Sequence, residues 1–474
     1  MKKLFCILAS VTLSVAMLFA GCSLKGADGI DGRDGKDGQN VTINAIYEEY
    51  VSKNGEISFE DFLKIYLSYT DSELSNAASL KTAINHSLMS GVSILTRFTY
   101  RSGQSTHKVY TGSGAILWLD KNAGDAYVVT NCHVIYDDTS TTTYCDDIRL
   151  YLYGQDMAGI NYVLTRISND ITNDENYRIP ASIVGASVTY DIALLKVTGS
   201  DVLKRNSSSV TAVSSKTNIL EALNDSFVQD DVSYVGETVY AIGNASGEGM
   251  SASNGIISKD SENIDVGLSD ANANSYNSYR VLRTTAPINH GNSGGALYNV
   301  SGKIVGIVNA KDQGEDIDNM GYALPANTVR RLLVSMYDRY VANGNSAVSG
   351  TRRYGINKAL LNIRTVVSDS YARLNEDGIA VITELVKVDT VSGSPAYGVL
   401  EVGDILLSAK LTGTDGKVKE DIQINRNYSL SEMLISARLG DTLTLRIERV
   451  IDGETVEKEV KVKFDSNNYF NYNN

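Results

Sequence analysis

A serine set among glycines gives this sequence its clearest chemical signal. Residues 289–297 read NHGNSGGAL, with Ser293 near the centre. Small neighbours let such a loop turn tightly, so that the serine Oγ is exposed and backbone N–H groups can face a substrate oxygen. Acyl transfer needs both, a nucleophile and an oxyanion hole. The same string also fits a simple turn, so Ser293 predicts chemistry only if a base accompanies it.

One histidine follows a segment rigid enough to position a base. The histidines are His86, His107, His133 and His290. His133 lies near the end of the apolar run 126–135 (AYVVTNCHVI), which predicts a strand. His86 falls in a predicted helix and His107 in a polar loop. His290 is too near Ser293 in the chain for their side chains to meet. His133 is therefore the candidate base, although a lone histidine is more often structural.

An aspartate opens the apolar segment DIALLKV, residues 191–197. One interpretation is that Asp191 only caps a strand. A catalytic imidazole, however, needs a carboxylate that fixes its orientation. The order His133, Asp191, Ser293 is also the chain order of the chymotrypsin-type triad. Three separate signals in this order predict a serine hydrolase site.

The elements that must position these residues are mostly strands. From about residue 90 to 335, short β-branched runs alternate with turns rich in Gly, Asn, Asp and Ser, which is typical of an all-β barrel or sandwich. A helix is predicted at Val329–Tyr340, and Ser207–Asp231 is predicted to be an insertion loop with a short helix at Ile219–Leu223. The predicted strands are Val92–Phe98, Ala115–Leu119, Ala126–Thr130, Ile148–Tyr153, Ile192–Val197, Thr238–Ile242, Gly255–Ser258, Val281–Thr284 and Lys303–Val308.

Together these segments resemble the bacterial HtrA/Deg-type trypsin-like serine proteases with a C-terminal PDZ domain. The resemblance implies a mainly β fold: a chymotrypsin-like double β-barrel over residues 90–340, then a PDZ domain. The first 89 residues lie outside the resemblance, and the pattern before residue 90 predicts a short helical spacer. The matching segments are 130–134 (TNCHV), 191–196 (DIALLK) and 291–295 (GNSGG), supported by 236–244, 254–258 and 321–325.

The resemblance implies a role for each matched residue. Ser293 would attack the scissile carbonyl, His133 would take and return the proton, and Asp191 would fix the tautomer of His133. The backbone N–H groups of Gly291 and Ser293 would form the oxyanion hole, with Asn292 shaping the loop. Neither a metal nor an organic cofactor is implied.

Two positions depart from the family pattern. Thr285 stands where the family commonly has Asp, and His290 stands where it commonly has Pro. Because residues 285–290 (TAPINH) contain no acid, a preference for Lys or Arg lacks its usual anchor. We therefore expect cleavage after small or medium apolar residues.

A second strand-rich module covers residues 351–464. Its segments SPA (394–396) and GD (403–404) resemble the PDZ signature, although an unrelated β-domain is the alternative. PDZ domains add a peptide as an extra strand and hold its C-terminal carboxylate on backbone N–H groups. The helix expected to line the groove is Ser429–Arg438. The expected peptide-binding residues are Tyr354, Gly355, Ile356 and Asn357 in the carboxylate loop, and Met433 and Leu434 in that helix.

The N-terminus has the pattern of an export signal. Residues 1–21 combine a basic start, an apolar run and small residues, as in a signal peptide, with a transmembrane anchor as the alternative. The following Cys22 resembles a lipoprotein cleavage site, which implies a lipid anchor on the extracytoplasmic side of a bacterial membrane. The other expected segments are a Gly-x-Asp tether at 22–40, a helical spacer at 41–89, a linker at 341–350 and a disordered tail at 465–474.

Composition limits the function classes further. A chain of 474 residues suits about three domains. A net charge of −13 without a basic tract argues against nucleic-acid binding. Four cysteines are too few for a disulfide-built fold, although Cys132 and Cys145 could pair beside the triad.

The leading hypothesis is a lipid-anchored serine endopeptidase that acts on unfolded or damaged exported proteins, with a PDZ domain that binds peptide C-termini. One alternative is a chaperone or adaptor that binds proteins without cutting them, and another is a passive surface lipoprotein. The complete triad favours the enzyme. The resemblance also implies a homo-trimer.

Overall fold

The chain divides into two compact units, residues 1–79 and 80–474. The predicted signal peptide, Cys22 and the tether lie outside the residues that the structure describes. The computed structural model describes residues 47–48, 50–52, 55, 57–58, 62, 80–102, 104–155, 176–229, 235–266, 277–311, 320–345, 355–393, 396, 398–466 and 469–472.

The described residues are mainly β, which confirms the predicted fold class. The strands are β1 (Gly91–Ser102), β2 (Gln104–Asp120), β3 (Asp125–Thr130), β4 (Asp147–Leu152), β5 (Ile179–Pro180), β6 (Ser182–Ser187), β7 (Ile192–Val197), β8 (Thr238–Gly243), β9 (Ser251–Val266), β10 (Asn277–Thr284), β11 (Ala296–Asn299), β12 (Ile304–Lys311), β13 (Gly321–Pro325), β14 (Ile356–Ala359), β15 (Ile363–Leu374), β16 (Ala380–Val391), β17 (Ile405–Thr412), β18 (Val418–Gln423), β19 (Thr442–Ile451), β20 (Glu454–Lys463) and β21 (Tyr469–Tyr472). The labelled helices are α5 (Asp201–Arg205), α6 (Ile219–Asp225), α7 (Ala326–Ala342) and α8 (Ser429–Met433), with 3-10 turns η1 (Cys132–Val134) and η2 (Ala245–Gly247).

Seven strands form the first sheet, in the order β5-β4-β1-β2-β3-β7-β6. β3 and β7 are antiparallel neighbours, with Thr130 opposite Ala193. Successive side chains of a strand point to opposite faces, so the nearly complete burial of β7 means that both faces of the sheet are covered there. The end of β3 and the start of β7 therefore meet inside the protein.

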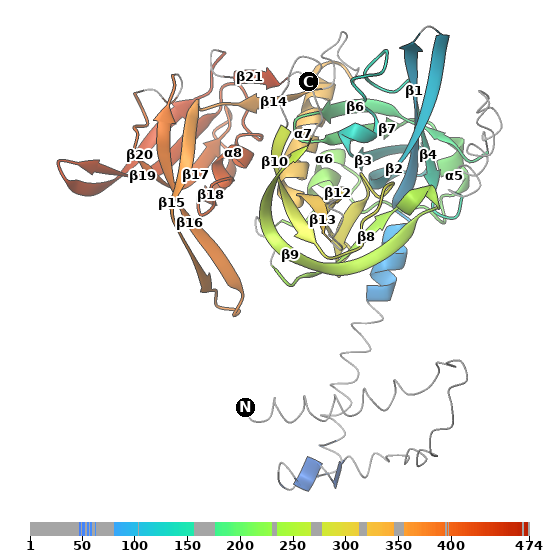
Figure 1. The fold of residues 1–474 in the computed structure, drawn as a ribbon, viewed down its shortest axis with the longest axis horizontal. Coiled ribbons are helices and arrows are strands. Elements are labelled where there is room, and N and C mark those ends of the chain that lie inside the picture. The colour runs from blue at the N-terminus through green and yellow to red at the C-terminus, as the bar shows by residue number, and fades with distance from the viewer. Residues whose placement is uncertain are drawn as a thin grey trace. The chain divides into compact units, whose positions relative to one another are not determined.

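The second sheet is a closed barrel, in the order β10-β13-β12-β11-β8-β9. The long strand β9 curves around it and pairs with β8 on one side and β10 on the other (Figure 1). The expected double barrel is thus corrected in one respect, because the first sheet is open. Its edge strand β5 has only two residues, and Pro180 in it has no N–H to donate.

Two helices pack against the core between the first two sheets, and one of them changes a predicted boundary. α7 buries Val329, Leu332 and Leu333 in the largest apolar cluster. Residues 80–88 are helical, and Leu88 belongs to the same cluster. The last part of the predicted spacer at 41–89 therefore belongs to the compact unit that begins at residue 80.

The segment Ser207–Asp231, predicted as an insertion loop, is built into the core at α6. Leu223 and Phe227 are buried in the largest apolar cluster. The side chain of Asn218 accepts hydrogen bonds from the Leu220 and Glu221 N–H groups, which caps the start of the helix.

The C-terminal module has a sheet and a core of its own. Its sheet runs β15-β16-β17-β19-β20, with β18 added beside β17. Side chains including Val388, Leu443 and Phe464 form a separate apolar cluster. β14 lies outside this sheet and pairs with β21 (Figure 1).

Two predictions for this module are corrected. The groove helix, expected at Ser429–Arg438, ends at Met433, because the following turns tighten: the Ile435 N–H bonds to the Glu432 carbonyl (3.1 Å) and the Ser436 N–H to the Met433 carbonyl (2.9 Å). The tail at 465–474 was expected to be disordered, but Tyr469–Tyr472 forms β21, because the edge of β14 supplies backbone partners.

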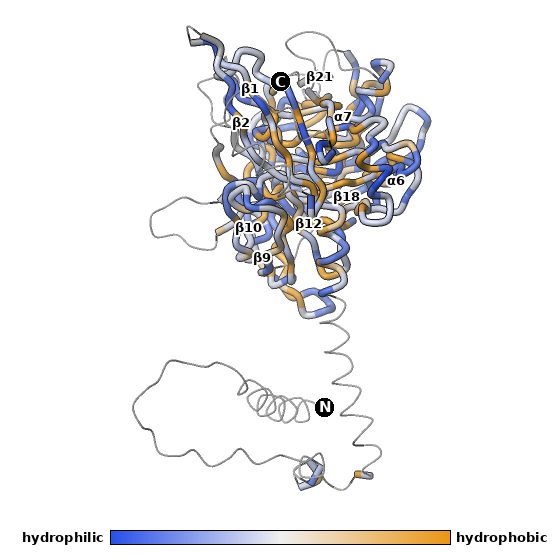
Figure 2. The backbone as a smooth tube through the Cα atoms, turned by 90° about the vertical axis from the view of Figure 1, so that its right-hand side faces the viewer, coloured by the Kyte–Doolittle hydropathy of each residue, from blue (hydrophilic) through white to orange (hydrophobic). Residues whose placement is uncertain are grey.

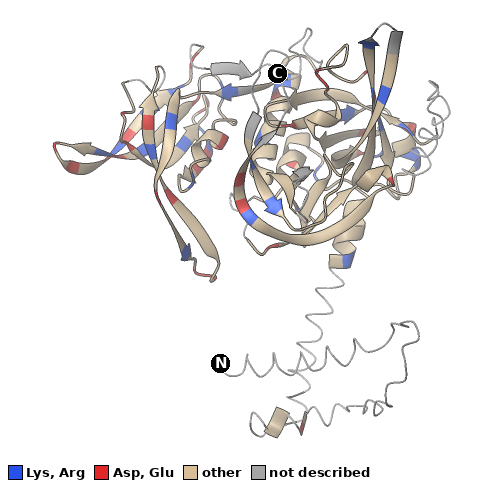
Figure 3. Ribbon diagram, in the orientation of Figure 1, with Lys and Arg blue, Asp and Glu red and all other residues tan. Residues whose placement is uncertain are grey.

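Hydropathy and charge follow this architecture in the described residues. Hydrophobic stretches run along the strands, whereas many turns are hydrophilic (Figure 2). Basic and acidic residues are interspersed along the described ribbon rather than gathered by sign on one element (Figure 3). Within the same residues, no helix is both long and apolar enough to cross a bilayer.

Candidate active site

His133 and Asp191 are brought together by the neighbouring strands β3 and β7. His133 lies in η1, just after β3, and Asp191 immediately precedes β7. His133 Nδ1 lies 2.7 Å from Asp191 Oδ2. The His133 backbone N–H donates to the other carboxylate oxygen, Oδ1, at 2.8 Å. Two contacts to one carboxylate fix the direction of the imidazole.

Asp191 is buried, and two asparagines hold it, one through its carboxylate and one through its backbone carbonyl. Asp191 is fully buried and its φ is +50°, a conformation that non-glycine residues rarely adopt. Asn309 on β12 donates its Nδ2 to Asp191 Oδ2, and Asn131 donates its Nδ2 to the Asp191 carbonyl at 2.9 Å. Tyr279 on β10 donates its hydroxyl to Asn309 Oδ1 at 3.0 Å. The second barrel thus helps to place an aspartate of the first sheet.

The pKa of His133 is raised above its ordinary value by this carboxylate. Burial alone would lower the pKa, because it disfavours the charged imidazolium. The negative charge of Asp191 and its hydrogen bond to the ring favour the charged form and outweigh burial. This arrangement stabilises the imidazolium that a general base forms when it accepts a proton.

Ser113 on β2 holds the Ser293 loop from the first sheet. Its N–H donates to the Ser293 carbonyl at 2.8 Å. Its Oγ donates to the Gly291 carbonyl at 2.6 Å and accepts from the Asn244 N–H at 2.8 Å. Because Ser113 is fully buried, these bonds are shielded from water.

Glycine is required at two positions of the Ser293 loop. Gly291 has φ +92°, and a Cβ there would lie 2.2 Å from the Asn244 carbonyl oxygen. Gly294 has φ +84°, and a Cβ there would lie 2.2 Å from Thr130 Oγ1. Both the conformation and the space exclude a side chain. The glycines that predicted a tight loop therefore also let it pack against the neighbouring strands.

The expected oxyanion-hole donors have no hydrogen-bond acceptor among the described residues. Among the described residues, the N–H groups of Gly291 and Ser293 donate no hydrogen bond. The side chain of Asn292, between them, is buried, and its Oδ1 has no partner among those residues. Two N–H groups of one loop that have no acceptor among the described residues can bind a developing oxyanion.

Ser293 is on the same site but points its hydroxyl elsewhere. Its Oγ donates to the Asn309 carbonyl at 3.2 Å. Within the described residues, Ser293 and His133 share no hydrogen bond. Asn309 therefore contacts two members of the predicted triad, Asp191 through its side chain and Ser293 through its backbone. Catalytic hydrogen bonds often form only when substrate is bound.

The other histidines and the cysteines take no part in these contacts. His107 Nδ1 lies 3.0 Å from Thr99 Oγ1 on the β1–β2 hairpin. Cys132 and Cys145 are both free thiols, so the disulfide that the sequence allowed is absent. Burial raises the pKa of the Cys132 thiol well above its usual range, and the nearby Asp191 charge adds to the effect. Cys132 is therefore an uncharged core residue next to His133.

The expected peptide-binding residues of the C-terminal module lie in two places. Ile356 begins β14 and is buried in the largest apolar cluster together with Ile435. The carbonyl of Gly355 accepts a hydrogen bond from Arg339 on α7 at 2.8 Å. Met433 and Leu434 are buried in the apolar core of the module. Of the remaining two, Tyr354 lies outside the described residues, and Asn357 is described by its backbone alone.

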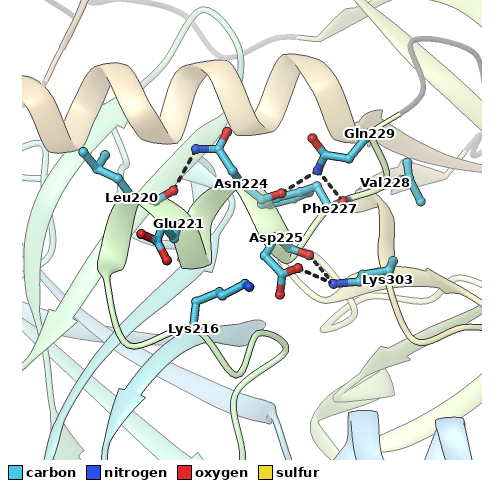
Figure 4. A pocket seen from close by; sticks show the side chains of 9 residues that line it. All are labelled: Lys216, Leu220, Glu221, Asn224, Asp225, Phe227, Val228, Gln229 and Lys303. Atoms are coloured by element: carbon cyan, nitrogen blue, oxygen red, sulfur yellow. Dashed lines mark hydrogen bonds and ion pairs between the residues drawn. The ribbon is translucent and has the colours of Figure 1, made fainter.

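A surface hollow beside α6 is separate from these residues. Its volume is about 580 Å³. Asp225 and Lys303 pair within it, with 3.0 Å between Oδ1 and Nζ (Figure 4). The lining residues are Lys216, Leu220, Glu221, Asn224, Asp225, Phe227, Val228, Gln229 and Lys303. None of the predicted site residues is among them. Elsewhere too, the described residues offer no group of three His, Cys, Asp or Glu that could hold a metal ion.

Sequence reasoning missed the polar residues that support the triad. Asn309 lies within the apolar run VGIVNAK of the closed barrel and contacts Asp191, which precedes β7 of the first sheet. Ser113 lies within GSGAIL of the first sheet and contacts Gly291 in the Ser293 loop. A polar residue inside an apolar strand was the only local signal. Neither residue shows in the sequence which distant group it contacts.

Known proteins with similar sequences were found for most of the chain. Residues 112–307 match a family model described as a trypsin-like peptidase domain. The chain is 26% identical over 370 residues to the serine protease Do-like HtrA of Bacillus subtilis (strain 168), a match covering 77% of this chain and 66% of the relative. It is 27% identical over 346 residues to the periplasmic serine endoprotease DegP of Escherichia coli (strain K12), covering 70% and 59%. The match thus spans two thirds or less of each relative.

Among solved structures, one titled HtrA-type protease AlgW with tripeptide aligns with 81% of this chain and 96% of its own chain. The sequence identity is 18% and the TM-score 0.46.

Proposed function

Because this chain belongs to the HtrA-type, trypsin-like serine endopeptidases, we propose that Ser293, His133 and Asp191 cleave peptide bonds in unfolded or damaged proteins. The observation that carries the proposal is the 2.7 Å contact between His133 Nδ1 and Asp191 Oδ2, with the aspartate fully buried. This contact leaves Nε2 as the ring nitrogen that can take a proton from a nucleophile.

The reaction begins with a rotation of the serine side chain. Ser293 Oγ leaves the Asn309 carbonyl and donates to His133 Nε2, which takes its proton as Oγ attacks the scissile carbonyl. The N–H groups of Gly291 and Ser293 bind the oxyanion. His133 then protonates the leaving amine. Water next attacks the acyl-enzyme while His133 takes its proton, and His133 returns that proton to Ser293 Oγ.

We further propose that the enzyme cleaves after small or medium apolar residues. Thr285 stands where an acid would select Lys or Arg, and its Oγ1 already accepts the Ile256 N–H at 3.0 Å. A peptide library digested by the protein should yield apolar residues at the cleaved position. A profile dominated by Lys and Arg would contradict this assignment.

The cellular setting is part of the proposal. Signal peptide 1–21 and lipidation of Cys22 would place the enzyme outside the cytoplasm on a bacterial membrane, and one relative is named a periplasmic protease. The PDZ-like module at 351–464 would select peptide C-termini. The homo-trimer stays a prediction. Incorporation of radiolabelled palmitate that is lost in Cys22→Ser tests the anchor.

A second candidate function is a chaperone that holds unfolded proteins without cutting them. The observation in its favour is that Ser293 Oγ faces the Asn309 carbonyl at 3.2 Å, away from a catalytic hydrogen bond. A protein fixed in that arrangement would bind unfolded chains and leave them intact.

Cleavage of casein at neutral pH separates the two functions. The expected result is cleavage by the wild type and a loss of at least about a thousandfold in Ser293→Ala and His133→Ala. The matched control is His290→Ala, because His290 is an exposed histidine in the same loop, and this variant should stay active. Equal cleavage by Ser293→Ala would refute the nucleophile. Suppression of casein aggregation by an inert wild type would favour the chaperone.

A further inference from the structure

β21 is paired with the strand that follows the expected carboxylate loop. Tyr469–Tyr472 runs antiparallel to Ile356–Ala359, with Tyr472 opposite Ile356 and Tyr469 opposite Ala359. The two strands form a sheet of their own, so β21 is the only strand partner of β14 among the described residues. β14 starts directly after Gly355, in the segment assigned to bind peptide ends.

The polarity of this pairing is that of a bound peptide. A PDZ domain takes a peptide as an added antiparallel strand whose C-terminal end lies at the carboxylate loop. Here the C-terminal end of β21 lies at the Ile356 end of β14, next to Gly355. The backbone groups that a peptide would use on this edge are therefore used by the chain itself.

We propose that β21 is a resident intramolecular ligand of the PDZ-like module, and that free protein C-termini bind β14 by displacing it. This inference rests on the proposed peptide-binding function of that module. Five residues separate β20 from β21, so the tethered strand competes at an effective concentration of about a millimolar. A peptide that binds the open edge of β14 with micromolar affinity should then bind the full chain at least about ten times more weakly.

The edge of β14 should persist when β21 leaves, because other elements hold the strand. Arg339 on α7 donates to the Gly355 carbonyl at 2.8 Å. Lys358 Nζ donates to the Tyr190 hydroxyl at 2.6 Å. Ile356 and Ala359 are both buried. Neither hydrogen bond uses β21, and Ile356 and Ala359 belong to apolar clusters that contain residues of other elements, so removal of β21 should leave an ordered strand.

Peptide affinity with and without β21 tests the proposal. The protein is the full chain with Ser293→Ala, which prevents cleavage, compared with the same chain ending at Ser466. This truncation keeps Phe464, a core residue of the module. The probe is a fluorescein-labelled peptide, NNYFNYNN, which has the sequence of residues 467–474 and a free carboxylate. Fluorescence anisotropy should give a Kd at least about tenfold lower for the truncated chain.

Two proline variants of the untruncated chain provide matched controls. Asn471→Pro places proline inside the paired segment, opposite Asn357, where it disrupts the ladder, so its Kd should approach that of the truncated chain. Ser466→Pro lies in the connecting segment before β21 and should leave the Kd of the full chain unchanged.

Each outcome is decisive. Equal Kd values for the full and truncated chains would refute the resident ligand while keeping peptide binding by the module. Absence of binding by the truncated chain would refute peptide binding itself, and the resident ligand with it. A lower Kd in both proline variants would mean that the pairing of Asn471 is not what blocks the edge.

Discussion

At the scale of single residues, the site depends on how one carboxylate changes the chemistry of one imidazole. Asp191 is buried and contacts both the ring and the backbone N–H of His133. Burial and charge act on the pKa of His133 in opposite directions, and the charge prevails. The base is therefore neutral and active only above a pKa that lies higher than the ordinary value of about 6.5.

The acid side of the activity profile should reflect this pKa. Peptidase activity should fall as the pH drops through a midpoint above about 6.5, because protonated His133 cannot accept the serine proton. In Ser293→Ala, NMR titration of the His133 ring should give the same raised pKa. Asp191→Asn in that background should lower the pKa below 6.5, because burial then acts unopposed.

The same shift links His133 to stability. The folded state holds this proton more tightly than the unfolded chain, so the stabilisation is complete below about pH 6.5 and disappears as the pH rises through the folded-state pKa. A His133 midpoint at or below 6.5, or one unchanged by Asp191→Asn, would contradict the account.

Residue type and chain order were enough to predict that His133 and Asp191 contact each other, and not enough to predict how they and Ser293 are held. His133, Asp191 and Ser293 each have a local signal: a strand end, an acid before an apolar run, and flanking glycines. Asn309 has only its position as a polar residue in an apolar strand, which does not show which carboxylate it contacts. Its contact joins residues far apart in the sequence.

At the scale of elements, the β1–β2 pair presents two serines that differ in one respect. Ser93 on β1 lies opposite Ser113 on β2, and both are fully buried. Ser113 Oγ joins Gly291 and Asn244, whereas Ser93 Oγ has no partner among the described residues. Ser113 therefore fixes the Ser293 loop, and Ser93 on the neighbouring strand is a matched control for replacing a buried serine.

Replacing Ser113 by alanine should damage the enzyme. The Gly291 carbonyl and the Asn244 N–H would lose their buried partner, at a cost of about 1–3 kcal/mol each in the free energy of unfolding. Displacement of the nucleophile loop should reduce kcat by roughly 10–100-fold. Ser93→Ala should change neither stability nor kcat appreciably. Similar effects of the two changes, in urea unfolding and peptide hydrolysis, would refute the role of Ser113.

Elements with a strong apolar period were predictable, and those that depend on a partner were not. β3 and β7 have apolar runs that specify buried strands by themselves. β21 has the sequence YFNY within an asparagine-rich tail, so its strand conformation comes from the free edge of β14. α8 ends early because the backbone after Met433 tightens into turns, with Ile435 bonded to Glu432 and Ser436 to Met433.

At the scale of the whole chain, buried ion pairs join the C-terminal module to the protease domain. Glu432 on α8 forms two bonds to Arg280 on β10, with Nε 2.6 Å from Oε1 and Nη2 3.0 Å from Oε2. The ring of Tyr428 stacks on Arg280, 3.8 Å from the ring centre to Cζ. The residue before Arg280 is Tyr279, which holds Asn309 against Asp191. β10 therefore connects the module to Asp191 through Asn309.

The burial of two opposite charges explains why this pair should contribute to stability. Burial raises the pKa of Glu432, but the charge and hydrogen bonds of Arg280 outweigh it, so the pKa stays below its ordinary value and the group stays ionised. Both side chains are less than 10% exposed. Glu432 also lies 3.7 Å from Arg331, between Oε2 and Nη1. Removing Glu432 would leave the Arg280 charge buried without its carboxylate partner, which is far more costly than losing an exposed pair.

Glu432→Ala should therefore lower the free energy of unfolding by about 3–5 kcal/mol. The matched control is the exposed pair Lys410–Asp421, with 3.0 Å between its charged atoms, where Asp421→Ala should cost less than about 1 kcal/mol. Replacing Arg280 and Glu432 together by methionine should restore most of the loss, because no charge is then left unpaired. Urea unfolding followed by circular dichroism measures all three. If Glu432→Ala is as mild as Asp421→Ala, the two domains are not held together by this pair, and the connection from α8 through β10 to Asp191 loses its anchor.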